Sequence, residues 1–258
     1  MAQEPVPPAL LALRVGTPVS QSTWGPDIDA ALAGKMGVIA ARHGVVERAR
    51  AQALDQALHD LAAAIDAGGT GDRLDLAVTA LLEAESGLIQ ADVAVVGTLG
   101  AALGPDRRAK RAAHGPVPML LLVVSAHPLA RQVDPAARVP EGVLRPGDLA
   151  HLAPARALSR RAWDEWRAVA AELVASLAAL PAGDEAFASA YVDATRPALA
   201  ALARARASSV RPLVELAATL PGDRRRALAD GARLREALLV SQSELDATTV
   251  DAAPPPPP

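Results

Sequence analysis

Asp55 and His59 come nearest, in type and spacing, to the ligands of a metal site in this sequence. Side chains four residues apart lie on the same face of a helix, and Glu83 or Glu85 could be supplied by the next helix. Imidazole together with carboxylate suits zinc, nickel or copper. The alternative is an ordinary solvated pair of side chains. The sequence therefore predicts either a divalent transition metal held by Asp55, His59 and one of these glutamates, with Glu83 as the first candidate, or no cofactor.

Motifs of the common catalytic chemistries are missing from the sequence. There is no cysteine, which excludes disulfides, thiolate zinc sites and cysteine nucleophiles. Gly34-Lys35-Met36 is not a phosphate loop, because it lacks the upstream glycine and the following serine or threonine. No Gly-x-Ser-x-Gly, His-Glu-x-x-His or paired Glu-x-x-His motif occurs. We therefore expect a protein that is not an enzyme, unless a site assembles from distant groups such as His127 and His151 with carboxylates.

Arginine-rich turns and a tryptophan pair are the candidates for contacts with a partner. The turns could bind an acidic partner or be solvated charge at helix starts. The tryptophans, three residues apart, could form an exposed aromatic patch or pack in the core. Asp92 interrupts an apolar stretch, so it could pair with an arginine across a bundle or lie on an exposed face. The candidate partner-binding residues are Arg107, Arg108, Trp163, Trp166, Arg224 and Arg225.

The overall charge argues against nucleic acid as the partner. The net charge is −3 and the isoelectric point about 6.0, so there is no general attraction to nucleic acid or to an anionic membrane surface. The arginine-rich turns also lack interleaved aromatic residues. We therefore expect a protein partner, or self-association, through amphipathic helices.

Composition indicates which elements must position these residues. Apolar residues make up 51% of the chain and aromatic residues 2%, which argues against an all-β fold. We divide the chain into a Pro-rich irregular N-terminal segment, a first helical unit, a Pro-rich connector, a second helical unit and a disordered polyproline tail. These segments span residues 1–26, 27–113, 114–157, 158–245 and 246–258.

Apolar periodicity and glycine or proline breaks predict the helices. In the first unit, one helix starts at Asp27 and ends at Arg42-His43-Gly44, and two more cover about 45–67 and 72–103. In the second unit, Ser159 could cap a helix that runs to about residue 180. A long helix over about 185–220, kinked or split at Pro197 and Pro212, and a last helix over about 224–245 follow. The connector is predicted to be an ordered loop, with 118–125 a buried strand or one buried helical turn.

The two helical units share the same order of elements. Asp106-Arg107-Arg108 recurs as Asp223-Arg224-Arg225, 117 positions later. The same offset pairs Leu82 with Leu199, Val93 with Val210, Leu99 with Leu216 and Leu103 with Leu220. The pattern indicates an internal duplication.

Two turns carry a resemblance to a known family. Leu103-Gly-Pro-Asp-Arg-Arg108 and Leu220-Pro-Gly-Asp-Arg-Arg225 resemble the second Leu-Thr-x-x-Gln-type turn of the Spy/CpxP and periplasmic heavy-metal-sensor superfamily, although the threonine and glutamine are missing. Leu158-Ser-Arg-Arg-Ala162 could stand for the first such turn. The resemblance covers about 45–110 and 158–240, and it implies tandem helical hairpins with a non-enzymatic binding role. It assigns no metal ligand.

The prediction is an all-α fold of tandem helical-hairpin units packed as a bundle, and a non-catalytic binding protein of stress-sensor or chaperone-like type. The alternatives are a cytosolic scaffold or oligomerisation module, and an enzyme with a dispersed active site. An exposed concave apolar groove would favour the first function and a closed bundle the second. No signal-peptide pattern and no membrane span are evident, because Gln90 and Asp92 interrupt the apolar region 88–103. We expect a cytoplasmic location, or a periplasmic one if an export signal precedes this chain.

Overall fold

The structure is a computed structural model that describes residues 29–68, 71–107, 134–139, 141–178, 180 and 184–238. Its elements are helices: α2 (Ala30–Asp66), α3 (Asp72–Leu103), α6 (Pro135–Arg138), α7 (Pro146–Ala178), α8 (Asp184–Thr219), α9 (Gly222–Leu228) and α10 (Gly231–Leu238). The described residues hold no strand, only an isolated bridge between Glu141 and Leu144. The predicted all-α fold is confirmed.

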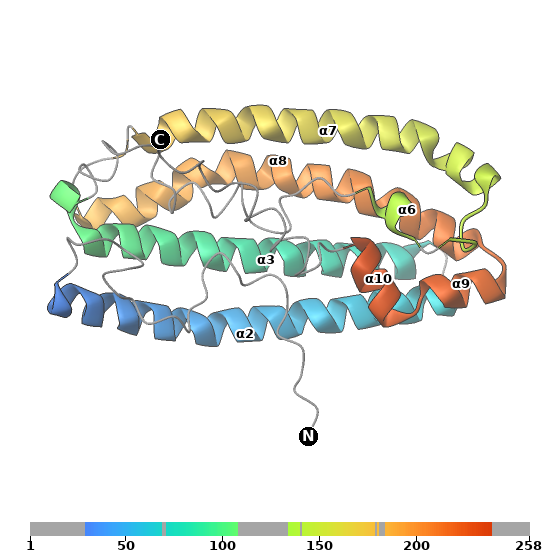
Figure 1. Cartoon of the computed structure of the whole chain (residues 1–258), viewed down its shortest axis with the longest axis horizontal. Coiled ribbons are helices and arrows are strands. Elements are labelled where there is room, and N and C mark those ends of the chain that lie inside the picture. The colour runs from blue at the N-terminus through green and yellow to red at the C-terminus, as the bar shows by residue number, and fades with distance from the viewer. Residues whose placement is uncertain are drawn as a thin grey trace, which may run out of the picture.

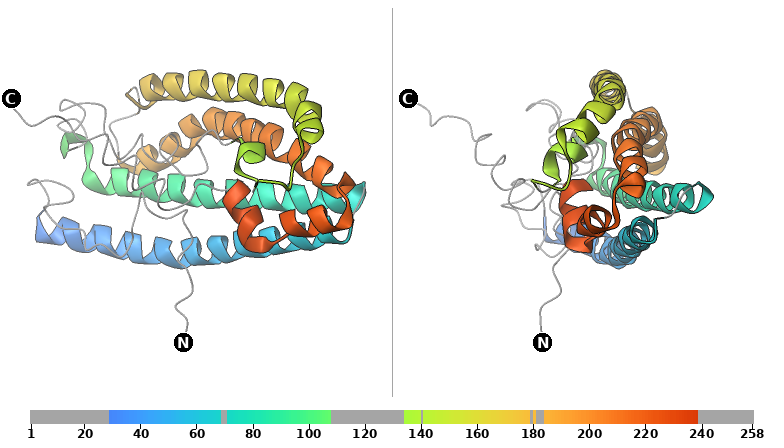
Figure 2. Two further views of the ribbon diagram at one scale, coloured as in Figure 1. Left: turned by 45° about the vertical axis from the view of Figure 1, so that its right-hand side comes forward. Right: turned by 90° about the vertical axis from the view of Figure 1, so that its right-hand side faces the viewer.

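The four long helices lie side by side in the order α2, α3, α8, α7 (Figure 1). Each of these helices packs on the next, so α3 and α8 are the inner pair. The short helices α6, α9 and α10 gather at one end of the bundle, where they contact α2 and α8 (Figure 2). Helices α2 and α3 form a first hairpin, and α7 and α8 a second. A single cluster of buried apolar side chains runs through both hairpins, so the helices form one bundle around one core.

Helix α2 is continuous, and the helix end predicted at Arg42-His43-Gly44 is wrong. His43 and Gly44 are both buried, and His43 Nε2 lies 2.9 Å from Asp92 Oδ1 on α3. A glycine inside a helix costs about 1 kcal/mol, which packing along the whole length of α3 outweighs. Asp29 caps α2, because its Oδ1 accepts the Leu32 N–H at 2.8 Å.

Helix α7 begins at Pro146, so the start predicted at Ser159 is wrong and the unit boundary predicted at 157/158 falls inside a helix. Proline suits the first turn of a helix, where its missing N–H has no partner to lose. The Asp148 carboxylate accepts the Arg145 N–H at 2.7 Å, which supports this start and holds the pKa of Asp148 below its usual value. Pro154 lies inside α7 on the exposed side.

The C-terminal helices differ from the expectation in two ways. Helix α8 runs unbroken past Pro197 and Pro212, so it is not split. The predicted last helix is instead two short ones, because α9 ends at Leu228 and α10 starts at Gly231. Asp230 Oδ1 accepts the Arg233 N–H at 3.2 Å, as expected of a residue that starts a new helix.

Several predictions fall on residues that the structure does not describe. These are the irregular N-terminal segment, the 118–125 strand candidate, Arg108, the end of the last helix and the polyproline tail. The third predicted helix is confirmed with its bounds, since α3 spans Asp72–Leu103.

The 117-residue offset places equivalent residues in equivalent surroundings. Adding 117 to the residue numbers of α3 gives residues that lie almost entirely within α8, so the offset relates the two inner helices. Leu82 and Leu199 are both half-buried, and the other three apolar pairs are buried in both hairpins. The offset also pairs Asp92 with Ser209. Asp92 is hydrogen-bonded to His43 on α2 and Ser209 to Ser159 on α7, so each side chain contacts the long helix that precedes its own. The 117-residue offset therefore relates equivalent helices of the fold as well as similar stretches of sequence, and the internal duplication stays a prediction.

Among the described helices, α3 has the length and composition that would allow it to cross a membrane. Of the most apolar 18-residue stretch of α3, 56% is buried inside the bundle, as is typical of a core helix. It also carries the buried carboxylates Glu85 and Asp92.

Gly97 on α3 allows the close approach of α8. A Cβ at this position would lie 3.1 Å from the Ala188 carbonyl oxygen and 3.1 Å from Tyr191 Cδ1. Gly97→Ala is expected to lower the free energy of unfolding by about 1 to 2 kcal/mol, because backbone must move. Gly34→Ala on α2 is the matched control: its Cβ would meet nothing within 4 Å. It should stabilise the fold by about 0.5 to 1 kcal/mol. Urea unfolding measures both, and equal effects would contradict the close packing.

Candidate metal centre

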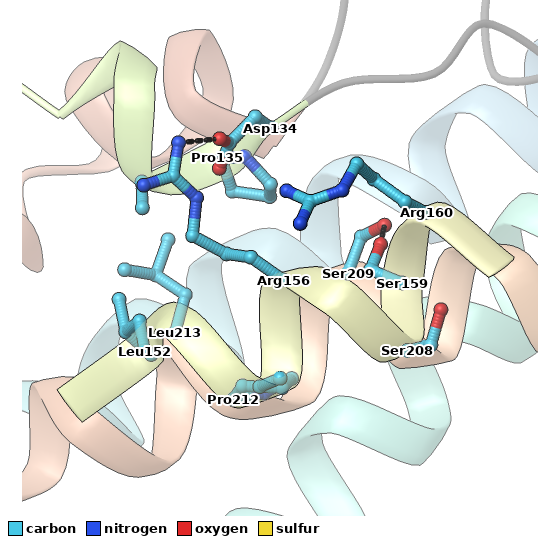
Figure 3. A pocket seen from close by; sticks show the side chains of 12 residues that line it. Asp134, Pro135, Leu152, Arg156, Ser159, Arg160, Ser208, Ser209, Pro212 and Leu213 are labelled. Carbon is cyan, nitrogen blue, oxygen red and sulfur yellow. Dashed lines mark hydrogen bonds and ion pairs between the residues drawn. The ribbon is translucent and has the colours of Figure 1, made fainter. Parts of the chain in front are cut away.

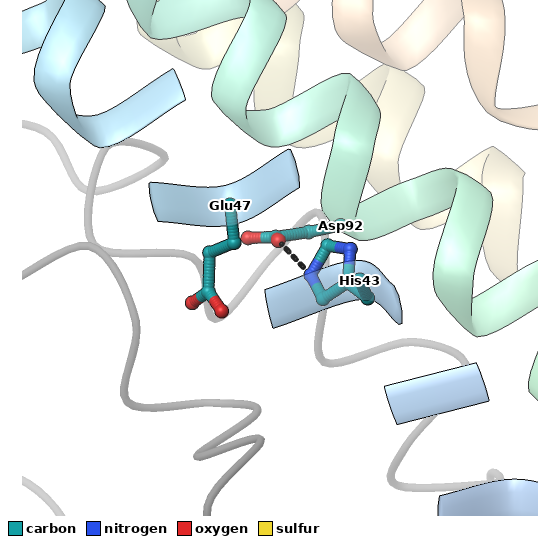
Figure 4. A group of neighbouring side chains, drawn as sticks. All are labelled: His43, Glu47 and Asp92. Atoms are coloured by element: carbon teal, nitrogen blue, oxygen red, sulfur yellow. Dashed lines mark hydrogen bonds and ion pairs between the residues drawn. The ribbon is translucent and has the colours of Figure 1, made fainter. Parts of the chain in front are cut away.

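His43, Glu47 and Asp92 form a buried cluster between α2 and α3 (Figure 4). One ligand atom from each residue lies within 4.8 Å of the others. The exposed fractions of the three residues are 6%, 5% and 5%, so water reaches none of them freely. His43 Nε2 and Asp92 Oδ1 are 2.9 Å apart, and the Glu47 carboxylate points to one side of that pair. Within the described residues this is where histidine and carboxylates converge.

The electrostatics of the cluster penalise negative charge on Glu47. Burial and the nearby Asp92 carboxylate raise the pKa of Glu47 from 4.5 to about 7, and His43 opposes the shift. A cation bound beside Glu47 would favour its charged form, as His43 and Arg48 do in part.

Glu47 is expected to make the protein less stable as the pH rises. Because its folded pKa lies above the unfolded one, its contribution to stability is complete below about pH 4.5 and lost as the pH passes about 7. Glu47→Gln should therefore raise the free energy of unfolding at pH 8 by about 1 to 3 kcal/mol relative to the parent, with little difference at pH 4. Urea unfolding across this pH range measures it. Exposed Glu83→Gln is the control, and the same pH trend in both variants would contradict the assignment.

The residues predicted as metal ligands do not converge in the structure. Asp55 and His59 are exposed on α2, and Glu83 is exposed on α3. Asp55 pairs with Arg235 of α10. Twelve residues along a helix amount to a rotation of about 120°, so the Asp55–His59 pair faces away from the side of α2 that His43 and Glu47 occupy.

The buried cluster contains the same spacing signal as the predicted one. His43 and Glu47 are four residues apart, as are Asp55 and His59. The helix break predicted at Gly44 separated His43 from Glu47 and so hid the pair. Asp92 pairs with His43, and it is not on an exposed face.

The tryptophans are core residues, so the interpretation of them as an exposed partner patch is wrong. Trp163 is 0% and Trp166 is 6% exposed. Their rings meet edge to face, with centroids 5.7 Å apart and an interplanar angle of 79°. Trp163 Nε1 also donates to Ser209 Oγ at 2.8 Å.

The described arginines of the two turns are engaged within the chain. Arg107 lies 3.0 Å from the Asp29 carboxylate, and the pKa of Asp29 is lowered by its bond from the Leu32 N–H and by this arginine. Arg224 donates to the Val143 carbonyl at 2.7 Å and pairs with Asp148. Arg225 donates to the Asp66 carbonyl at 3.1 Å. These three side chains hold the ends of the bundle together, which is a structural role that the sequence did not predict.

The histidines considered for a dispersed active site are not brought together by the described residues. His151 is exposed on α7, and His127 lies outside the described residues. The cavity that the structure shows between α6, α7 and α8 has no histidine in its lining.

Comparison of the chain with protein-family models, with curated proteins and with solved structures finds no match.

Proposed function

We propose that this chain is a non-catalytic helical binding protein that takes up a divalent transition metal through His43, Glu47 and Asp92. The observation that supports the proposal is a buried imidazole and two buried carboxylates whose ligand atoms lie within 4.8 Å of one another. Residues of these types are rarely buried together unless they bind a cation or a proton.

The donor set suits zinc and the neighbouring transition metals. Ligand atoms bound at about 2.0 to 2.2 Å from a metal stand about 3 Å apart, so side-chain rotation, mainly of Glu47, would close the site. Two carboxylates and a neutral imidazole would cancel the charge of a divalent ion. Binding displaces the protons that the free site holds, so affinity is expected to rise with pH through about 7, the pKa of Glu47.

Metal binding would join α2 to α3 at a buried point. The first hairpin would then be more rigid with metal than without it, and the bundle would respond to metal through its stability. This behaviour is that of a metal-responsive binding protein of the stress-sensor type. A chaperone-like groove is not needed for it.

The midpoint of thermal unfolding with and without excess Zn²⁺ or Ni²⁺ tests the proposal. An ion at a hundredfold excess over its dissociation constant should stabilise the fold by about 2.7 kcal/mol. Glu47→Gln and His43→Ala should lose most of this gain. Glu47→Gln is informative because it should stabilise the metal-free protein, so misfolding would not explain the loss.

His59→Ala is the matched control for that experiment, because His59 is an exposed histidine on the same helix. It should keep the full gain. If neither ion shifts the midpoint, or if His59→Ala abolishes the shift while His43→Ala keeps it, the proposed site is wrong.

Self-association as a scaffold has less support among the described residues. Val38, Val45 and Val46 are exposed on α2 by 53%, 61% and 47%. Together with Leu76 on α3 and Leu158 on α7, the other exposed large apolar side chains among the described residues, these valines are far fewer than the roughly 20 to 30 residues a side that a stable protein interface buries. The scaffold function stays a prediction.

A further inference from the structure

A small cavity lies between α6, α7 and α8, away from the α2–α3 cluster (Figure 3). Its volume is about 120 Å³. One part of its lining is apolar and the other is polar with two cations. The lining residues on which the inference rests are Asp134, Leu152, Arg156, Arg160, Pro212 and Leu213.

The two arginines stand one turn apart on α7 and reach toward the same end of the cavity (Figure 3). Arg156 pairs with Asp134, but its Nε is buried and has no hydrogen-bond partner. A buried donor without a partner is unfavourable, and a bound acceptor would satisfy it. Arg160 is exposed at the mouth. With one carboxylate against two guanidinium groups, this end of the cavity has an excess of positive charge.

The serines of the cavity add few free donors. Ser208 Oγ donates to the Ala205 carbonyl at 2.8 Å. Ser209 Oγ contacts Ser159 Oγ at 2.7 Å, accepts from Trp163 Nε1 and donates to the Ala205 carbonyl at 3.1 Å. The arginines are therefore the groups that would bind an anion, and Trp163 is one hydrogen bond away from the lining.

We propose that this cavity binds a small aliphatic carboxylate, with its carboxylate on Arg156 and Arg160 and its alkyl chain against Leu152, Pro212 and Leu213. Guanidinium groups match the geometry of carboxylates. A cavity of about 150 Å³ holds benzene, so this one suits a ligand of about five or six non-hydrogen atoms. Phosphate would fit the arginines, but it would place charged oxygens against the apolar wall.

Butyrate is the probe, titrated at constant ionic strength while the indole N–H resonance of Trp163 is followed by NMR. We expect a saturable shift, absent with the neutral analogue butyramide. Arg160→Gln should weaken butyrate binding at least tenfold. Arg161→Gln is the matched control, because Arg161 is exposed on the same helix and does not line the cavity. It should leave the affinity unchanged.

Four results would overturn the proposal. The first is the absence of saturable binding at about 10 mM butyrate, which is the range expected for so small a ligand. The second is equal binding of butyrate and butyramide. The third is equal weakening in Arg160→Gln and Arg161→Gln, which would indicate a general charge effect. The fourth is phosphate binding as tightly as butyrate, because the apolar wall would then contribute nothing.

Discussion

Replacing Arg206 by methionine is expected to lower the free energy of unfolding by about 3 to 5 kcal/mol, which is among the largest effects of any single substitution in this chain. Arg206 on α8 binds Glu85 on α3 through two hydrogen bonds, of 2.9 Å from Nε and 2.6 Å from Nη2. Both side chains are 3% exposed. Arg206 Nη2 also donates to the Leu238 carbonyl at 3.0 Å. The substitution leaves the Glu85 carboxylate buried without its counter-charge.

The reason for the loss can be tested with a double variant. In Glu85→Leu with Arg206→Met no charge is left buried, so most of the stability should return. Arg211→Met is the matched control, because Arg211 also joins α8 to α3, through Asp75 at 3.1 Å. That pair is largely exposed, and its loss should cost less than about 1 kcal/mol. Urea unfolding followed by circular dichroism measures all three. A double variant as unstable as Arg206→Met would show that packing, and not the unpaired charge, explains the loss.

Replacing Trp163 by alanine is expected to cost about 3 to 5 kcal/mol. The indole is fully buried between α7 and α8, touches Trp166 and donates to Ser209 Oγ. The substitution removes a large apolar surface from the second hairpin and leaves a cavity that the surrounding helices only partly close. Urea unfolding measures the cost.

The hydrogen bond of Trp163 can be separated from its packing by a pair of conservative variants. Trp163→Phe keeps an aromatic ring and loses the bond to Ser209, which should cost about 1 to 2 kcal/mol. Trp166→Phe is the matched control, because the buried Nε1 of Trp166 has no hydrogen-bond partner. It should cost less than Trp163→Phe. The opposite order would contradict the role assigned to the Trp163–Ser209 bond.

Arg206 acts on a contact between the two hairpins and Trp163 on the packing within the second hairpin, whereas the proposed metal centre lies within the first hairpin. The Glu85–Arg206 pair joins α3 to α8, and the cluster of His43 and Asp92 joins α2 to α3. Because α3 carries both carboxylates, metal binding and the packing of the two hairpins share one helix. Metal-induced stabilisation should therefore be measured in the parent protein, in which the Glu85–Arg206 pair is intact.

Local signals in the sequence determined the helical class and the bounds of α3. Alanine-rich apolar periodicity predicts helix over most of the chain, and a helix needs only neighbours within one turn to form. Gly71 and Gly104 flank α3 at φ of 64° and 78°, a conformation that glycine adopts readily, so the ends of this helix follow from residue type alone. The offset between the two units was also visible in the residues themselves.

Tertiary contacts decided what local signals left open. The glycine at 44 is a helix-end signal, yet α2 continues because its buried face packs along α3 and His43 meets Asp92, 49 residues away. Glu85 finds Arg206 across 121 residues, a pairing for which the sequence offers no local cue. The cluster of His43, Glu47 and Asp92 needs a continuous α2 and the register of α2 against α3. Residue types thus set where helices form, and packing between helices decides which of their polar side chains are buried together.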